Sequence, residues 1–435
     1  MALCKCLREY RTAFVESEEV ALVESDGTER KEVAYVELYQ WQKQLRTALN
    51  GGDEGLVIGI SLMPFSIEET TTMLLVAEEK EWSYVPIEVE LSLSRQILLL
   101  QSAGARRLVT TAKSPLAKYF GGIHRDEVEV VELASSSFGV VQVVNFSNIL
   151  FNDTEFDQKL KEDEGLVSPL YVLFTSGTTG EPRGVVGART GAWTRLKWMW
   201  TTYPFDESER VLRATKLSFV DSVWEILGAF LGRVPLVHVQ SPRDPASAQL
   251  NLRSVVLDNS TQFLEVIQSE NVTRFTAVPS VLEVLLLQTT EKDRNATLSG
   301  LRYVLSSGEA LRLHVLQQLT TNLPDATILN LYGSTELSGD VTCMELKAPF
   351  SSAQIAQWQQ HGVPIANLDR TTTRSEATKA RSKGILCVSG PLLSFGYIGD
   401  GHEGAYVDSD DLPGVQNGIK QCKDGFTIAD ERTML

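Results

Sequence analysis

One stretch of about ten residues constrains this chain more than any other. The apolar run Tyr171-Val172-Leu173-Phe174 is followed by residues 175–184, Thr-Ser-Gly-Thr-Thr-Gly-Glu-Pro-Arg-Gly. A short run of β-favouring residues predicts a buried strand, and the glycines, hydroxyls and proline that follow predict its loop. Such a loop can bind phosphate, because glycines let backbone N–H groups approach an anion and Arg183 adds a charged donor. An ordinary surface turn is the alternative.

The loop differs from the phosphate loop of nucleoside triphosphatases, because its spacing lacks the Gly-Lys-Ser/Thr ending.

The composition of the chain limits which other classes of function it can have. With 435 residues, 43% hydrophobic and 22% charged, the chain is long enough for two or three subdomains. Its net charge of −16 argues against nonspecific nucleic-acid binding and leaves room for a local basic pocket.

The cysteines and the termini predict a compartment. Five scattered cysteines, with no Cys-x-x-Cys pair, predict free thiols and no zinc site: Cys4, Cys6, Cys343, Cys387 and Cys422. The first residues have no apolar core of signal-peptide length, and no apolar run reaches membrane-spanning length. We therefore expect a soluble cytoplasmic protein without a membrane or nucleic-acid partner.

Strand-like and helix-like segments alternate along the first quarter of the chain. Residues 56–63 and 82–87 are apolar and strand-like, and residues 66–79 and 94–103 have helical patterns. Alternation at this spacing predicts βαβ units and a mostly parallel sheet. The expected fold class is α/β, in layered subdomains.

Six motifs in order resemble those of the adenylate-forming superfamily: acyl-CoA synthetases, luciferases and the adenylation domains of nonribosomal peptide synthetases. The strongest are residues 175–184 and 328–336, the latter reading Ile-Leu-Asn-Leu-Tyr-Gly-Ser-Thr-Glu. The others include residues 84–87, 306–311, 362–367 and 384–397, so the resemblance covers roughly residues 33–397. The chain most resembles synthetase-like adenylation domains and β-alanine-activating enzymes of the 2-aminoadipate-semialdehyde-dehydrogenase type. One departure is Arg183, where the family usually has lysine.

The resemblance implies an ATP site and a magnesium site. It assigns catalysis to Thr175, Thr335 and Glu336, with Glu336 binding Mg²⁺. Tyrosine offers a π face to adenine, a hydroxyl donates to an oxyanion, and a carboxylate is a hard ligand for a hard cation. The implied ATP-binding residues are Thr175, Ser176, Gly177, Thr178, Thr179, Gly180, Arg183, Gly184, Ser307, Gly308, Glu309, Asn330, Tyr332, Gly333 and Thr335.

The resemblance also implies a pocket for the acid substrate. The matching positions are Val220, Asp221, Trp224, Thr276, Leu305, Ser307, Leu331, Gly339 and Asp340. Relatives that activate α-amino acids hold the ammonium group with an aspartate at the position of Val220, whereas here the aspartate is one place later. The set resembles pockets for β-alanine, in which Asp221 would pair with the ammonium group. Alternatively, Asp221 merely caps the helix that follows.

The implied reaction is ATP-dependent activation of a small carboxylic or amino acid to an acyl-adenylate, for transfer to a phosphopantetheine carrier or CoA thiol. We expect residues 1–397 to form the large AMP-binding domain and residues 398–435 an acidic, glycine-rich tail. The family's small C-terminal domain, which carries a catalytic lysine, is not expected in this chain. Two hypotheses follow: an acid–thiol ligase that is impaired, or a truncated ATP- and substrate-binding fragment of a longer acyl-activating protein. A complete acyl-CoA ligase for another substrate class is disfavoured by Asp221 and the missing lysine.

Overall fold

The alternation of strands and helices expected from the sequence is present. The computed structural model describes residues 2–49, 56–80, 82–123, 128–135, 139–146, 168–176, 182–239, 252–288, 298–365, 386–388, 391–398, 406–408 and 426–430. Strand β3 (Leu56–Ser61), helix α3 (Ile67–Glu78), strand β4 (Trp82–Pro86) and helix α4 (Leu93–Ser102) follow the predicted segments within a few residues. Helix α3 begins where predicted because the Ser66 hydroxyl accepts from the Glu69 N–H at the N-cap.

One large sheet has the strand order β17-β9-β8-β4-β3-β5-β7-β6. Its further strands are β5 (Arg107–Thr111), β6 (Val128–Ser135), β7 (Gly139–Phe146), β8 (Pro169–Ser176), β9 (Pro182–Ala188) and β17 (Tyr397–Ile398). Only the central strands β8, β4, β3 and β5 pair in parallel, and the flanking pairs are antiparallel. The expectation of a mostly parallel sheet is therefore wrong for this sheet, because β-hairpins extend it on both sides.

The other large sheet has the order β15-β14-β13-β12-β10-β11-β1-β2. Its strands are β1 (Val20–Ser25), β2 (Arg30–Ala34), β10 (Val211–Arg213), β11 (Leu236–Val239), β12 (Arg274–Ala277), β13 (Tyr303–Ser306), β14 (Thr327–Ser334) and β15 (Gly339–Leu346). All pairs from β14 to β1 are parallel, as predicted, and only the two edge strands run antiparallel. A small third sheet joins β16 (Leu386–Val388), β19 (Phe426–Asp430) and β18 (Tyr406–Asp408).

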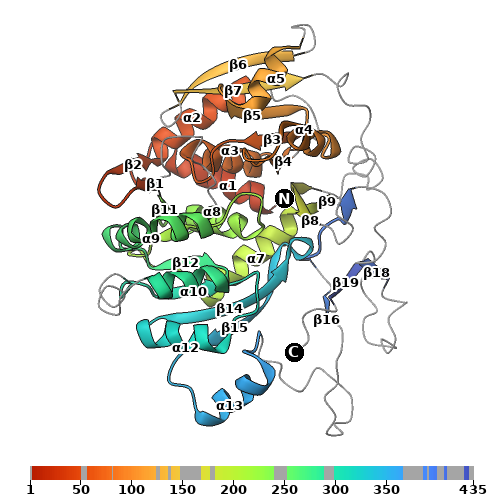
Figure 1. Ribbon diagram of the computed structural model, residues 1–435. Helices are drawn as coiled ribbons and strands as arrows, with labels where there is room; N and C mark the ends of the chain where they lie inside the picture. The colour runs from red at the N-terminus through yellow and green to blue at the C-terminus, as the bar shows by residue number, and fades with distance from the viewer. Residues whose placement is uncertain are drawn as a thin grey trace.

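Helices cover both faces of the two large sheets, which lie in the upper and lower parts of Figure 1. The helices that share a hydrophobic core with both sheets are α1 (Ala2–Phe14), α2 (Tyr35–Ala48), α3, α7 (Arg189–Thr202) and α8 (Asp221–Leu231). Helices α4 and α5 (Pro115–Gly121) form a second core with the first sheet. Helices α9 (Leu252–Ser269), α10 (Pro279–Gln288), α12 (Leu313–Asn322) and α13 (Ser352–His361) form a third core on the second sheet. The α/β class with layered subdomains is thus confirmed.

Side-chain alternation explains how each strand serves two cores. On β14, Leu329 and Leu331 belong to the core between the sheets, whereas Ile328 belongs to the core on the opposite face. On β13, Leu305 faces the inner core and Val304 the outer one. Successive residues of a strand point to opposite faces, so apolar residues at every position bury both faces. The inner face of this sheet therefore presents its side chains toward α7 and α8.

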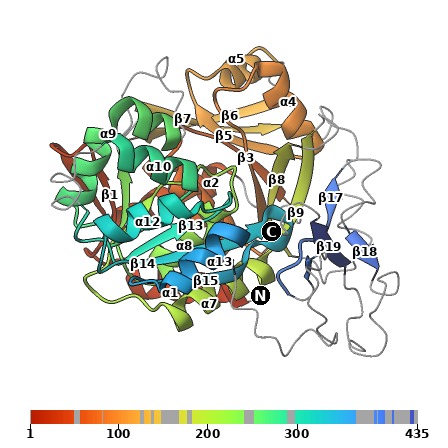
Figure 2. The same ribbon diagram turned by 60° about the horizontal axis from the view of Figure 1, so that its bottom comes forward.

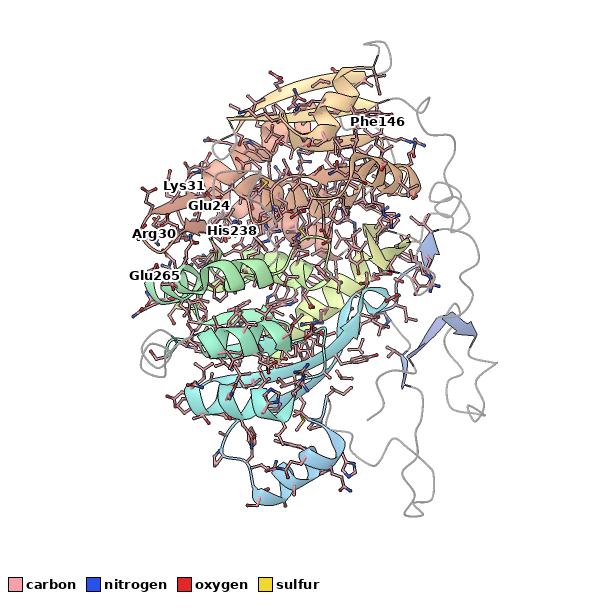
Figure 3. The ribbon with its side chains drawn as sticks, in the orientation of Figure 1. Glu24, Arg30, Lys31, Phe146, His238 and Glu265 are labelled. Atoms are coloured by element: carbon pink, nitrogen blue, oxygen red, sulfur yellow. The ribbon has the colours of Figure 1, made fainter. Side chains whose placement is uncertain are left out.

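The β1–β2 hairpin forms one edge of the second sheet and carries charged side chains. Glu24 and Lys31 are paired positions of the hairpin, and Arg30 Nε donates to Glu270 Oε2 of the loop after α9 at 2.9 Å. Figure 3 labels Glu24, Arg30 and Lys31 at this edge, near Glu265 of α9. Charged side chains on an edge strand oppose pairing with another chain. No helix in the described part of the chain is long and apolar enough to cross a bilayer.

Candidate active site

The predicted phosphate loop connects the two strands of a hairpin. Thr175 of β8 pairs with Arg183 of β9 at the end of the hairpin where the predicted loop lies in the sequence. Gly177, Thr178, Thr179 and Gly180 lie outside the described residues, as does the side chain of Ser176. Figure 2 shows the hairpin beside β17, which pairs with β9 through Tyr397 and Ile398.

Arg183 reaches from the hairpin toward Tyr397. Its guanidinium carbon lies 5.8 Å from the centre of the Tyr397 ring. Its Nε is buried and has no hydrogen-bond partner among the described residues. A half-buried guanidinium with a spare donor next to a glycine-rich loop suits an anionic oxygen.

The predicted magnesium ligand lies across from this hairpin. Glu336 belongs to the 3-10 turn Thr335–Leu337 that follows β14, and its Oε1 accepts a hydrogen bond from Tyr397 at 2.7 Å. The Thr335 carbonyl accepts from the Tyr171 hydroxyl of β8 at 3.3 Å. These contacts join the turn after β14 to β17 and to β8, the strand that leads into the predicted phosphate loop.

Glycine is required where β14 ends. A Cβ on Gly333 would overlap the carbonyl group of Gly339 on the neighbouring strand β15. The register of the β14–β15 pair also shifts between Tyr332 and Gly333, which marks a local bulge. The close approach of two backbones explains why position 333, near the end of β14, is a glycine.

The predicted adenine-side residues come from the ends of β13 and β14. Asn330 is buried, and its Nδ2 donates to the Pro364 carbonyl at 2.9 Å. Its Oδ1 is buried without a partner in the described structure. Gly308 has a φ of +83°, which glycine adopts without strain, and it starts an exposed turn with Glu309. The Glu309 carboxylate accepts from the N–H and hydroxyl of Ser280 at 3.1 and 3.0 Å.

The predicted acid-pocket residues converge between α8 and the inner face of the second sheet. Val220, Asp221, Trp224 and Gly339 line one enclosed cavity of about 10 Å³, which has room for about one water-sized group. Its other lining residues are Ala192, Arg195, Val223 and Ser338. Thr276, Leu305 and Leu331 are buried in the same layer, outside the cavity lining.

Asp221 is the first residue of α8, and the N-cap position belongs to Val220, which makes no side-chain cap bond. The alternative that Asp221 merely caps this helix is therefore wrong. Asp221 is half-buried and lines the small cavity instead.

Arg195 of α7 is the pocket residue that sequence reasoning missed. Its Nη2 lies 2.8 Å from Asp340 Oδ2, and the two side chains are 3% and 2% exposed. The second oxygen of Asp340 accepts from the Ser307 hydroxyl at 2.9 Å. The guanidinium carbon lies 4.7 Å from the Trp198 ring centre and 5.7 Å from that of Trp224. The sequence signal for Arg195 is a mixture of basic and aromatic residues on this helix, a pattern that is more typical of core packing.

Charge in the pocket is unequally distributed. Burial, and then repulsion from Asp340, raise the pKa of Asp221 well above its ordinary value, and Arg195 opposes this rise. Burial also raises the pKa of Glu225, one turn later on α8, to about 7, against hydrogen bonds from Thr215. The charges of Arg195 and Asp340 neutralise each other. An added cation would therefore stabilise the ionised form of Asp221 more than that of Asp340.

The residues present fit ATP and a magnesium ion. Asn330 Oδ1 is an orphaned buried acceptor suited to the amino group of a base, and Arg183 Nε is an orphaned donor suited to a phosphate. Glu336 offers one carboxylate, which suits Mg²⁺ because this ion keeps waters and phosphate oxygens as further ligands. Within the described ranges, no group of three or more His, Cys, Asp or Glu side chains forms a metal site by itself.

Comparisons with known proteins place the chain in a family. A family model described as AMP-binding enzyme matches residues 10–398. A mycosubtilin synthase chain of Bacillus subtilis is 32% identical over 264 residues, which is 57% of this chain and 9% of that protein. Zwittermicin A synthase ZmaJ of Bacillus cereus is 26% identical over 393 residues, or 88% of this chain and 66% of that protein. The chain therefore spans only part of these relatives.

The fold also has solved counterparts. The N-terminal subdomain of Klebsiella oxytoca NpsA, in complex with 3-hydroxyanthranilyl-AMSN, superposes with a TM-score of 0.65 at 18% identity. The match covers 98% of this chain and 95% of that one. At this identity the likeness describes the fold alone, that of the N-terminal subdomain.

Proposed function

The chain belongs to the AMP-binding enzyme family, and on this premise we propose that it activates a small amino acid, such as β-alanine, with ATP. In this reaction a carboxylate oxygen of the acid forms a bond to the α-phosphorus of ATP. The bond from that phosphorus to the oxygen bridging the β-phosphate breaks, and pyrophosphate leaves with the electron pair. The product is an acyl-adenylate.

The observation that carries the substrate class is the carboxyl group of Asp221, which lines the small cavity and has no salt-bridge partner of its own among the described residues. Asp340 is already neutralised by Arg195, whereas Asp221 faces a cavity with room for one water-sized group. An ammonium group is about that size, and its charge would offset the cost of ionising a buried carboxyl. A fatty acid would instead leave this carboxyl without a cation. A short amino acid with its ammonium group at Asp221 therefore fits the cavity better than an apolar chain does.

The remaining residues would position ATP. Arg183 would hold a phosphate oxygen, Asn330 Oδ1 would accept from the adenine amino group, and Tyr332 would contact the base. Thr175 and Thr335 would donate hydroxyl groups to the phosphates. Mg²⁺, held by Glu336, would neutralise charge on the phosphate oxygens. Such a site accelerates the reaction by orientation and electrostatic stabilisation, without a covalent enzyme intermediate.

We further propose that the acyl group passes to a thiol, either a phosphopantetheine carrier or CoA. The support is the family and the similarity to the mycosubtilin synthase, of which this chain spans a small part. The adenylation step and the thiol step can be tested separately, because only the first returns pyrophosphate to ATP.

The test is ATP–pyrophosphate exchange with β-alanine, propionate, hexanoate and a panel of α-amino acids. Propionate is the matched control, because it has the same carbon chain without the amino group. We expect exchange with β-alanine and little with propionate. Asp221→Asn should raise the KM for β-alanine about 10- to 100-fold, since a charge-assisted pair contributes about 1.5–3 kcal/mol, and should leave the KM for ATP unchanged. Asp325→Asn, at an exposed position, is the control variant.

Two results would contradict the proposal. Hexanoate or propionate exchanging as well as β-alanine would exclude Asp221 as an ammonium site. ATP binding without exchange for any acid would favour the alternative function, a weakly active or inactive ATP- and substrate-binding fragment of a longer acyl-activating protein.

A further inference from the structure

Arg195 borders two cavities. On one side is the cavity of about 10 Å³ that contains Asp221. On the other is a larger cavity of about 320 Å³ between α7 and β15, and Arg195 lines both. Asp340 lines the larger cavity, and its neighbour Gly339 lines the smaller. We call the ion pair between Arg195 and Asp340, which borders both cavities through Arg195, the wall.

The larger cavity has the character of a binding site. Its volume is at the lower end of the range for small-molecule pockets. Aromatic rings of Trp198 and Tyr203 line it together with Thr342 and Cys343. The Thr342 hydroxyl is buried and has no partner in the described structure. Nothing in the proposed function of the small cavity uses this space.

The wall is held by few bonds. Among the guanidinium nitrogens of Arg195, Nη2 bonds to Asp340, while Nε and Nη1 are buried without a described partner. The flanking rings of Trp198 and Trp224 hold the plane of the group by contact. Removal of the Arg195 side chain would therefore break its bond to Asp340, the polar bond that the described residues show in the wall.

We propose that the Arg195–Asp340 pair sets the maximum length of the acid substrate. This inference rests on the proposed function. An amino acid whose ammonium group reaches Asp221 ends against the guanidinium, so a longer acid has no space until the guanidinium is removed. Arg195 is thereby a specificity-determining residue, and the larger cavity is the space that a longer acid would enter.

The test compares β-alanine with 6-aminohexanoate, which has the same two end groups on a longer chain. In the wild-type protein, kcat/KM in ATP–pyrophosphate exchange should be at least about 10-fold lower for the longer acid, as is common for misfit in a closed pocket. Arg195→Ala with Asp340→Asn removes the wall together with both charges of the ion pair. This double variant should raise the ratio of the two kcat/KM values, 6-aminohexanoate over β-alanine, at least about 10-fold, mainly through KM.

Two further variants distinguish the effect of the volume of the Arg195 side chain from the effect of its charge and from a loss of protein stability. Arg195→Met with Asp340→Asn removes the charges and keeps most of the volume, so the wild-type length preference should persist. Arg213→Met with Glu69→Gln removes another buried ion pair, of 2.6 Å, that lines neither cavity. This control should lower the unfolding temperature without changing the length preference.

The outcomes distinguish this inference from the proposed function. If the wild type activates β-alanine and the opened, folded variant keeps the wild-type preference, the wall is not the determinant of length. Equal kcat/KM for both acids in the wild type would overturn the inference without any variant. Exchange with neither amino acid, but with propionate, would instead overturn the proposed function.

Discussion

Replacing Asp221 with asparagine should change how the stability of the ligand-free protein depends on pH. Burial and the neighbouring Asp340 raise the pKa of Asp221 in the folded protein, while the unfolded chain has the ordinary value near 3.9. Between these two values the folded state binds more protons than the unfolded state. Stability from this group is therefore fully present below the unfolded pKa and is lost as pH rises through the folded pKa.

The magnitude follows from proton linkage. One proton of difference lowers the free energy of unfolding by about 1.4 kcal/mol per pH unit while the pH lies between the two pKa values. Asparagine does not titrate, so the variant does not show this loss. The free energy of unfolding of Asp221→Asn, minus that of the wild type, should therefore increase with pH by up to that slope. Glu225, whose pKa burial raises to about 7, titrates in both proteins, so only the part of its contribution that comes from its repulsion of Asp221 remains in the difference.

Urea unfolding of both proteins at pH 5, 6, 7 and 8, followed by tryptophan fluorescence and far-ultraviolet circular dichroism, measures this difference. The slope m should be the same in both proteins, so that midpoints report stability. A difference that stays constant across the four pH values would refute the reasoning, because it would mean that Asp221 ionises with the same pKa in both states. β-Alanine should stabilise the wild type more than the variant if the ammonium group pairs with Asp221.

Two more predictions concern the nucleotide side of the site. Tyr397→Phe removes the hydrogen bond to Glu336 and should raise the Mg²⁺ concentration needed for half-maximal exchange about 10-fold, the effect expected of a residue that orients a metal ligand. A magnesium titration measures this, and an unchanged requirement would exclude Glu336 as the ligand or Tyr397 as its positioning residue. Gly333→Ala places a methyl group against the Gly339 backbone and should lower the free energy of unfolding by about 3 kcal/mol, whereas Gly121→Ala, which faces open space, should change it by less than about 1 kcal/mol. Equal midpoints for these two glycine variants in urea would contradict the close approach of β14 and β15.

Local sequence patterns predicted the elements well in the first quarter of the chain. The strands and helices from β3 to α4 lie within a few residues of their expected bounds, because apolar periodicity and serine N-caps act over short distances. The same reasoning overestimated parallel pairing in the first sheet. There, β6, β7 and β9 form antiparallel hairpin pairs, which depend on which strands meet rather than on the composition of each strand.

Some residues of the candidate site were likewise predicted from the sequence, and others were not. Motif order identified the phosphate-loop hairpin, the Thr335-Glu336 turn and Asp221, and the family match supports the resemblance on which those assignments rest. It did not identify Arg195 or Tyr397. Arg195 lies in a helix whose aromatic and basic residues suggest core packing, and nothing local indicates that its charge is compensated inside a pocket.

The sequence by itself determined the family and the α/β class, and it named four of the residues that line the small cavity, because each depends on short patterns that can be recognised in order. Only the tertiary structure decided which of the two aspartates forms the ion pair with Arg195. Arg195 and Asp340 are 145 residues apart and meet because α7 packs against β15. Charge pairing and burial depend on distances between such side chains, and those distances exist only after the layers have assembled.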